Sequence, residues 1–266
     1  MSFDDDIALL PAEPGVFDLV VPEHWRVARG ATNGGYIAAV IAQALEATVA
    51  DAARPLRSLT VHYLAGCRPG PVRVDVGVER AGRSLSTLTA RLRQDATVVA
   101  VALAALAADR PGLDFQHEPM PEAPPPEDVG GWPAVGRFPY FTTNWDYRPC
   151  IGSVPFSGSA RALTGGWLRP VQARSLDTPL LAAMADAWLP PVTLMLDEPR
   201  GMLPTIDLTV HFRAALPPPG MAADGFCFAV FEARVGAHGF WESDGLIWSR
   251  DGRLLAQARQ LALFNS

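Results

Sequence analysis

The sequence predicts an α+β protein made of two tandem copies of one unit, each a long helix wrapped by an antiparallel β-sheet. Three features recur in the same order in the two halves of the 266-residue chain: an apolar helix, a strand that leads into a Pro/Gly turn, and a closing hairpin. The strand and turn read LTVHYLAGCRPGP from Leu59 and LTVHFRAALPPPG from Leu208. Coincidence between common α+β patterns is the alternative, but three matches in one order favour an internal duplication.

The first repeat is expected over residues 1–110. Asn33-Gly34-Gly35 indicate a break in regular structure. After them, apolar residues recur at helical spacing as far as Thr48, which predicts an amphipathic helix. Four strands are predicted after this helix, at 57–64, 72–79, 84–94 and 97–108. Apolar and polar residues alternate in the third of them, which is typical of a sheet with one face in water.

A linker is predicted over residues 111–137. The stretch PEAPPPEDVGGWP, which begins at Pro121, is dense in proline and glycine and has little periodicity. Its composition therefore indicates a connection between the two repeats and not a part of either.

The second repeat is expected over residues 138–266. Asp177-Thr178-Pro179 is a good helix start, because Asp or Thr caps a helix and Pro is favoured in its first turn. This helix is expected to run to about Trp188, since Pro190 and Pro191 follow and would stop it. Strands are predicted at 138–150, 161–173, 205–214, 226–236, 239–249 and 253–264.

Composition argues against several classes of function. The net charge of −6 is spread without long runs, which argues against a nucleic-acid partner and against binding to acidic membranes. No metal is expected, because Cys67, Cys150 and Cys227 lie far apart and no His/Cys cluster has ligand spacing. No cofactor is expected either, because Gly34-Gly35 lack the spacing of a dinucleotide fingerprint. The stretch GSVPFSGSA does not supply a serine nucleophile elbow.

A soluble protein of the cytoplasm is the expectation from the remaining signals. An odd, sparse set of cysteines suggests a reducing compartment. The N-terminal stretch MSFDDDIALLP is acidic where a signal peptide would be basic. The longest apolar run, VVAVALAALAA from Val98, is too short to cross a membrane and suits a buried strand.

Candidate catalytic residues come from positions at which the two copies differ in polarity. Alignment of the helices places Asp186 opposite Gln43. Alignment of the repeated strand and turn, called here the repeated phrase, places Thr205 opposite Leu56. Alignment of the last strands places Gln260 opposite Ala104. Asp186 is the only charged residue from Thr178 to Leu196. A carboxylate on an apolar helix is costly unless it is hydrogen-bonded or has a chemical task.

Each of these residues also has a structural interpretation. Asp186 would be ordinary on a helix face that contacts water, and Gln260 would be ordinary on an edge strand. Thr205 would be ordinary at the start of a strand, where threonine is favoured. His62 and His211 occupy equivalent places in the repeated phrase, so they are interpreted as structural in both copies.

Several motifs resemble the double-hotdog acyl-CoA thioesterases of the bacterial thioesterase II and peroxisomal type. NGGYIAAVIAQAL is similar to the first-helix signature of that family, and VERAGRSLSTLTARLRQDATVVA is similar to its strand pair. PTIDLTVHF and DGRLLAQARQLALF resemble the strands that close the second hotdog. The resemblance covers most of the chain from Trp25 to Phe264, apart from the proline-rich middle, and is greatest to uncharacterised bacterial members.

The resemblance implies hydrolysis of an acyl-CoA thioester to a free acid and CoA. In that family an Asp, a Thr and a Gln of the second repeat hold and activate a water molecule, and they fall on Asp186, Thr205 and Gln260. The comparison of the two copies selects the same three positions. Asn33, Gly34 and Gly35 open the first helix, where backbone amides would suit the oxygen of the thioester carbonyl. Alternatively, Gly34 and Gly35 only form the turn that precedes the helix.

The resemblance also implies an acyl-CoA substrate, a role in fatty-acid or lipid metabolism, and a homo-oligomer formed through the sheets. Three departures bear on acyl-chain preference: Ala96 replaces a glycine, AWLPP follows Asp186 in place of the usual run, and Leu208 stands where histidine is often seen. Two other functions stay open. One is an acyl-CoA or acyl-chain binding module without turnover. The other is an enoyl-CoA hydratase, although the second helix has no histidine within reach of its Asp.

Overall fold

The computed structural model describes residues 2–132 and 138–264. Up to residue 107 its helices, 3-10 turns (η) and strands are α1 (Phe3–Asp6), β1 (Leu10–Glu13), β2 (Val16–Val21), η1 (Glu23–Trp25), η2 (Ala28–Gly30), α2 (Gly34–Val49), β3 (Leu56–Tyr63), β4 (Gly70–Ala81), β5 (Leu85–Gln94) and β6 (Thr97–Ala107). Beyond residue 107 they are η3 (Pro126–Asp128), η4 (Tyr140–Asn144), β7 (Trp145–Gly152), β8 (Ala162–Pro170), α3 (Thr178–Met184), η5 (Pro191–Met195), β9 (Thr205–Phe212), β10 (Cys227–Ala233), β11 (Gly236–Ala237), β12 (Phe240–Ser249) and β13 (Leu254–Leu263).

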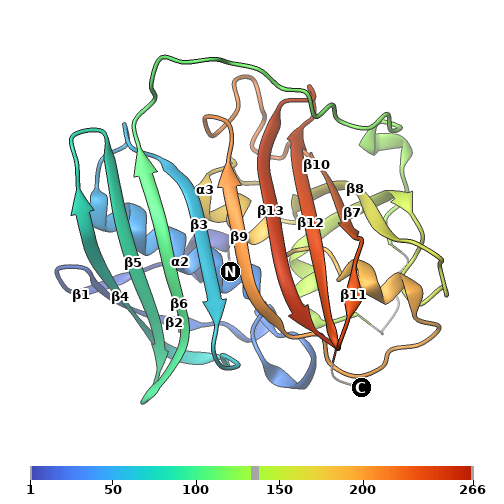
Figure 1. Ribbon diagram of the computed structural model, residues 1–266, viewed down its shortest axis with the longest axis horizontal. Coiled ribbons are helices and arrows are strands. Elements are labelled where there is room, and N and C mark those ends of the chain that lie inside the picture. Colours follow the sequence, from blue (N-terminus) through green and yellow to red (C-terminus); the bar gives the residue numbers. More distant parts are fainter. Residues whose placement is uncertain (1, 133–137, 265–266) are drawn as a thin grey trace.

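One antiparallel sheet runs through the whole molecule (Figure 1), in the order β1-β2-β4-β5-β6-β3-β9-β13-β12-β10-β8-β7, with β11 paired to β12. From the centre outward, the two halves have the same connectivity: β3-β6-β5-β4-β2-β1 on one side and β9-β13-β12-β10-β8-β7 on the other. The central pair, β3 and β9, carries the repeated phrase of the sequence, and Thr60 lies directly opposite Thr209. The predicted α+β class and the duplication are therefore confirmed.

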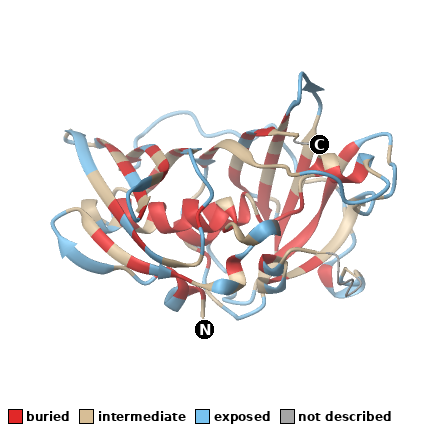
Figure 2. Ribbon diagram, turned by 90° about the horizontal axis from the view of Figure 1, so that it is seen from below, coloured by how far each residue is buried: buried red, intermediate tan, exposed pale blue. Residues whose placement is uncertain are grey.

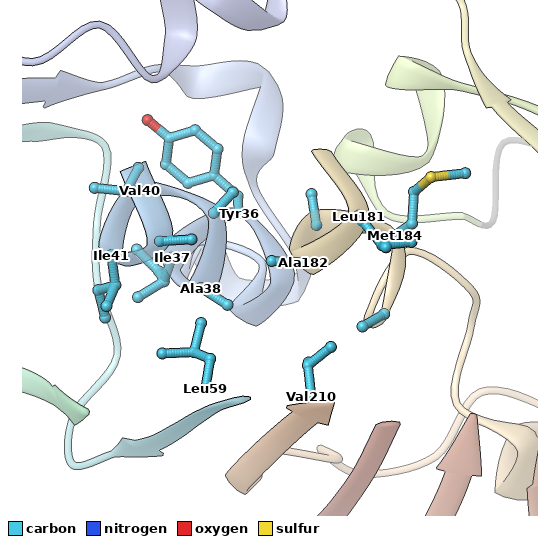
Figure 3. Packing of buried hydrophobic residues seen from close by; sticks show 14 of the residues in the cluster. Tyr36, Ile37, Ala38, Val40, Ile41, Leu59, Leu181, Ala182, Met184 and Val210 are labelled. Carbon is cyan, nitrogen blue, oxygen red and sulfur yellow. The ribbon is translucent and has the colours of Figure 1, made fainter. Parts of the chain in front are cut away.

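The helices α2 and α3 pack on each other and on the inner face of the sheet. Figure 2 shows them as the most buried part of the molecule, enclosed by the curved sheet. Leu59 of β3 and Val210 of β9 lie beneath the two helices (Figure 3), and both side chains are fully covered. Ten of the sixteen residues of α2 are buried, as expected for a helix that is apolar on nearly every side.

The caps of both helices follow from their sequences. The side chain of Asn33 accepts a hydrogen bond from the Tyr36 backbone and so begins α2, which ends where Ala50 adopts a left-handed conformation. The side chain of Asp177 accepts from the Leu180 backbone and begins α3, with a proline in the first turn. These two helix starts were predicted from the same residues.

The predicted end of the second helix at about Trp188 is wrong, because α3 ends at Met184. Beyond it the chain turns more tightly, and the backbone amides of Asp186 and Ala187 donate to carbonyls three residues back. The Asp186 carbonyl accepts instead from Asn33 Nδ2 and the Ala187 carbonyl from the Tyr147 hydroxyl. Side chains from other elements thus satisfy the carbonyls that a longer helix would have used.

Other boundaries differ at the chain ends and around the linker. The predictions lack the strands β1 and β2, and the strand expected at 138–150 begins only at Trp145 because Tyr140–Asn144 form a 3-10 turn. The linker does more than connect, since the Pro124 and Glu118 carbonyls accept hydrogen bonds from the indoles of Trp167 and Trp248. Its residues 133–137 lie outside the described part, and the repeat boundaries at 110 and 137 stay predictions. Among the described helices, none combines the length and apolar character that a membrane crossing requires.

Candidate active site

Asp186 lies in the turn after α3, at the N-terminal end of α2. Its Oδ2 atom accepts a hydrogen bond of 2.9 Å from the Gly35 backbone amide and one of 3.2 Å from Asn33 Nδ2. Asn33 Nδ2 also contacts the Asp186 carbonyl at 3.1 Å. The carboxylate of the second repeat is therefore held by the helix start of the first repeat, and Asp186, Asn33 and Gly35 meet in one place.

Asn33 is well placed for this contact because two of its other groups are fixed. Its Oδ1 atom accepts from the Tyr36 amide at 3.0 Å, and its own backbone amide donates to the Trp25 carbonyl at 2.8 Å. The residue is buried. Its Nδ2 group consequently has one orientation, toward Asp186.

Glycine is required where α2 approaches the second repeat. A Cβ atom on Gly35 would lie 2.6 Å from the Ala183 carbonyl oxygen, which no real side chain tolerates. A Cβ atom on Gly34 would lie 3.0 Å from Asp186 Oδ2 and 3.2 Å from the Tyr63 hydroxyl. The glycine pair therefore does more than mark a turn, because it lets the backbone reach the carboxylate.

Burial raises the pKa of Asp186 from 3.8 to about 7, and the hydrogen bonds from Gly35 and Asn33 oppose this rise. Desolvation wins because the surrounding protein is dense and brings no cation to the carboxylate within the described residues. The residue as a whole is only half-buried, so solvent still reaches part of it. A carboxylate that titrates near neutral pH, on a residue that solvent reaches in part, is suited to act as a general base.

Tyr63 is a residue of this region that the sequence comparison missed. Its hydroxyl donates to the Gly34 carbonyl at 2.8 Å. Burial, followed by the charges of Asp186 and Asp207, raises its pKa well above 10, so the phenol stays protonated and serves as a donor. The fifth residue of the repeated stretch is Tyr63 in the first copy and Phe212 in the second. This difference in polarity is the sequence signal that would have identified Tyr63.

Thr205 and Gln260 form the second group of candidate residues. Thr205 Oγ1 donates to Gln260 Oε1 at 3.2 Å, and Gln260 is buried. A β-bulge makes this contact possible: the ladder pairs Leu261 with Asp207 and then Ala262 with Thr205, so Ile206 is the extra residue. The bulge turns Thr205 to the same face as Gln260, whereas simple alternation would place it on the opposite face.

The sheet register supports the equivalence of positions on which the copy comparison relied. Leu208 lies opposite Gln260 in the second half, and Leu59 lies opposite Ala104 in the first. In the first half the carboxylate near these strands belongs to Glu46 of α2, whose pKa is raised by burial and lowered by hydrogen bonds from Thr178 and the Leu56 backbone. A partly buried acid therefore exists at each end of the helix pair, but only the second repeat has the hydroxyl and the amide beside it.

The described contacts leave the candidates in two groups: Asp186 with Asn33 and Gly35, and Thr205 with Gln260. Within the described part no hydrogen bond joins Asp186 to Thr205 or Gln260. The charges of Asp186 and of Asp207, a β9 residue, both raise the pKa of Tyr63, so Tyr63 lies between the start of α2 and the strand that carries Thr205. As for metals, residues 2–132 and 138–264 contain no group of three or more His, Cys, Asp or Glu side chains that could hold an ion.

Two models of one protein family match most of the chain. The acyl-CoA thioesterase N-terminal domain matches residues 21–107, and the acyl-CoA thioesterase C-terminal domain matches residues 116–264. The chain belongs to the acyl-CoA thioesterase family. A relative of this thioesterase-family chain, an uncharacterized protein of Mycobacterium tuberculosis, is 24% identical to it over 292 residues, which cover 98% of this chain and 97% of the relative.

Solved structures agree with the family assignment. A conserved protein of unknown function with the hot dog fold from Alicyclobacillus acidocaldarius superposes with a TM-score of 0.89 at 28% identity, over 99% of this chain and 98% of its own. An acyl-CoA thioesterase II from Mycobacterium marinum superposes with a TM-score of 0.79 at 22% identity, over 99% and 98% of the two chains. This thioesterase-family chain therefore has the double hotdog fold.

Proposed function

We propose that this thioesterase-family chain hydrolyses an acyl-CoA thioester to a free carboxylic acid and CoA by direct attack of a water molecule. The observation that carries the proposal is the half-buried Asp186 carboxylate, with its pKa raised to about 7, at the N-terminus of α2. Family membership supports the thioester as the bond that is cleaved.

In the proposed reaction Asp186 removes a proton from the water as its oxygen attacks the thioester carbonyl carbon. The C–S bond then breaks, and the proton on Asp186 passes to the CoA sulfur, which leaves as the thiol. A positioned general base typically contributes roughly 10²- to 10⁴-fold to the rate. No covalent intermediate with the protein is needed.

Thr205 and Gln260 would orient the same water. The Thr205 hydroxyl proton is engaged by Gln260 Oε1, so the hydroxyl oxygen can only accept a hydrogen bond from the water. Gln260 Nε2 has no hydrogen-bond partner in the described part of the chain, so it can donate to the water oxygen. With one lone pair of the water held in this way, the other is free to attack.

The carbonyl oxygen needs a donor when it becomes negative. Among the three backbone amides at the start of α2, that of Asn33 donates to the Trp25 carbonyl and that of Gly35 donates to Asp186. The Gly34 amide has no partner among the described residues, and it lies at the positive end of a helix of sixteen residues. We assign the oxyanion contact to Gly34 within this proposal, and the supporting contacts to Asn33 and Gly35.

Two further parts of the proposal concern the setting of the protein. We propose that it acts in the cytoplasm on intermediates of lipid metabolism, and that it forms a homo-oligomer through its sheets. Size-exclusion chromatography with light scattering tests the second part, which predicts a mass that is a multiple of the 28.5 kDa chain.

The test of function is thiol release from a panel of acyl-CoA thioesters, followed with a thiol reagent, together with calorimetric binding of the same compounds. Turnover of at least one thioester is the expected result. Binding without thiol release would contradict hydrolysis and identify an acyl-CoA binding module. Addition of water to an enoyl-CoA, without release of CoA, would identify a hydratase.

A further inference from the structure

Ser243 of β12 is a buried hydroxyl beside the candidate active site that has no task in the mechanism above. It lies directly opposite Gln260 in the β12–β13 ladder. The residue is only 2% exposed, and its Oγ atom has no hydrogen-bond partner within the described residues. Most buried hydroxyls in folded proteins are hydrogen-bonded, so an unpaired one at this place calls for a polar ligand.

The two repeats differ at this position in the same way as at the candidate catalytic positions. The first-half counterpart of the Ser243–Gln260 pair is Leu88 opposite Ala104, and both of these residues are buried and apolar. A polar pair in the second repeat therefore replaces an apolar pair in the first. Residues directly opposite in an antiparallel sheet share a face, with Cβ atoms about 4.5–5.5 Å apart, so Ser243 and Gln260 point into the same space.

The order of the strands gives the position of Ser243 relative to the reacting bond. Thr205, Gln260 and Ser243 stand on β9, β13 and β12, which are consecutive in the sheet. Asp186 is held on the other side by the start of α2, where the Gly34 carbonyl accepts a hydrogen bond from Tyr63 of β3, the strand next to β9. The attacking water belongs between these two sides, so Ser243 lies one strand beyond it, at a spacing of about 4.8 Å.

Apolar groups adjoin Ser243 along β12 and on the next strand, β10. Gly245 follows it on the same face of β12, and the ring of Phe231 lies over that glycine, where a Cβ atom would be 2.8 Å from Phe231 Cε1. The Phe231 ring also lies 6.3 Å from that of Trp188, and both residues are buried. An acyl group bound beside the candidate active site would meet this apolar region, and Ser243 is the polar residue at its border.

We propose that Ser243 donates a hydrogen bond to an oxygen substituent of the acyl group close to the thioester carbonyl, so that the favoured substrates are 3-hydroxyacyl or 3-oxoacyl thioesters of CoA. The inference rests on the proposed thioesterase function and extends it to a substrate class. An unsubstituted acyl chain would leave the Ser243 hydroxyl buried and unpaired, which costs binding free energy in the transition state.

The test compares 3-hydroxybutanoyl-CoA with butanoyl-CoA, two thioesters of equal carbon number. For the wild type, kcat/KM is expected to be higher with the hydroxylated substrate. Ser243→Ala is expected to lower the ratio of kcat/KM for the hydroxylated substrate to kcat/KM for butanoyl-CoA by about 2- to 12-fold, which corresponds to the net contribution of one hydrogen bond. Ser86→Ala is the matched control, because Ser86 is a buried serine of the first repeat on the equivalent strand β5, and it is expected to leave the ratio unchanged.

An unchanged ratio in Ser243→Ala would overturn the assignment. If both kcat/KM values fall equally, so that the ratio is unchanged, Ser243 acts at the water or the carbonyl instead. Failure of the underlying function has a different signature, because the wild type would then release no thiol from either compound. Circular dichroism and thermal unfolding of Ser243→Ala establish that the variant is folded before the ratio is measured.

Discussion

The Gly35 backbone amide donates a 2.9 Å hydrogen bond to Asp186 Oδ2, and this bond joins the first repeat to the second at the candidate active site. The two residues are 151 positions apart in the chain. A single repeat therefore holds only part of the site: the second supplies the acid, the hydroxyl and the amide, and the first supplies the helix start that orients the acid. Both copies therefore contribute to the candidate site, although only one carries the polar set.

Gly35→Ala is expected to abolish most of the activity. The new Cβ atom would lie 2.6 Å from the Ala183 carbonyl oxygen and 3.0 Å from Asp186 Cβ, so α2 and the turn after α3 must separate. We expect kcat/KM to fall at least about 10-fold and the free energy of unfolding to fall by about 1–3 kcal/mol, as for other overpacked sites. Gly112→Ala is the control, because nothing lies within 4 Å of its Cβ position. Equal kcat/KM values for both variants would contradict the close approach.

The pH dependence of activity follows from the raised pKa of Asp186, which is about 7. A general base works only when it is deprotonated, so kcat/KM is expected to rise with pH and to level off above roughly pH 7. Steady-state kinetics between pH 5 and 9 check this. A flat profile through this range would mean that a group other than Asp186 limits the reaction.

Stability is expected to show the opposite dependence. The pKa of Asp186 is about 7 in the folded protein, against 3.8 for an aspartate in water, so folding favours the protonated carboxyl. The free energy of unfolding is therefore expected to fall as the pH rises from about 4 to 7 and Asp186 ionises. The loss is at most about 4 kcal/mol, since one pKa unit corresponds to about 1.4 kcal/mol. Asp186→Asn should unfold at a higher urea concentration than the wild type at pH 8. The two midpoints should converge below pH 4, and a less stable variant at pH 8 would refute this.

Tyr63→Phe separates a role at the site from a role in the core. The substitution removes the 2.8 Å hydrogen bond to the Gly34 carbonyl, which anchors the glycine pair. We expect about 0.5–1.5 kcal/mol less stability and a several-fold lower kcat/KM. Tyr36→Phe is the matched control, because it removes a buried hydrogen bond of the same kind, to the Asp6 carbonyl, away from the carboxylate. It should lose similar stability and keep its activity; parallel losses of activity in both would contradict a local role for Tyr63.

Much of the fold could be predicted from the sequence because its signals are local. Asn33 and Asp177 cap helices by hydrogen bonds to residues three positions on, and such caps are recognisable in the sequence. The repeated phrase predicted equivalent strands, and these strands are the central pair of the sheet. Long-range contacts were not accessible in this way. The end of α3 at Met184 depends on Asn33 and Tyr147, which lie far away in the chain.

The candidate site was predicted in part, for physical reasons that differ from residue to residue. Asp186 stands out because a lone charge interrupts an apolar stretch. Thr205 was found by comparison of the copies and by the family resemblance and not from its own position in a strand, since the bulge at Ile206 that turns it inward has no signature in the sequence. Tyr63 and Ser243 look like ordinary strand residues when each is taken alone; each differs in polarity from its counterpart in the other copy, and hydrogen bonding and register show what that difference means.

The central claim is that catalysis belongs to the Asp186 carboxylate of the second repeat and not to Glu46, the acid on the helix of the first repeat. Asp186→Asn and Glu46→Gln test it most directly, because each replaces a partly buried acid of raised pKa by its amide at opposite ends of the helix pair. Measured as thiol release at saturating acyl-CoA, kcat should fall by about 10²- to 10⁴-fold in Asp186→Asn and stay within about twofold of the wild type in Glu46→Gln. Full turnover by Asp186→Asn, or its loss only in Glu46→Gln, would contradict the account.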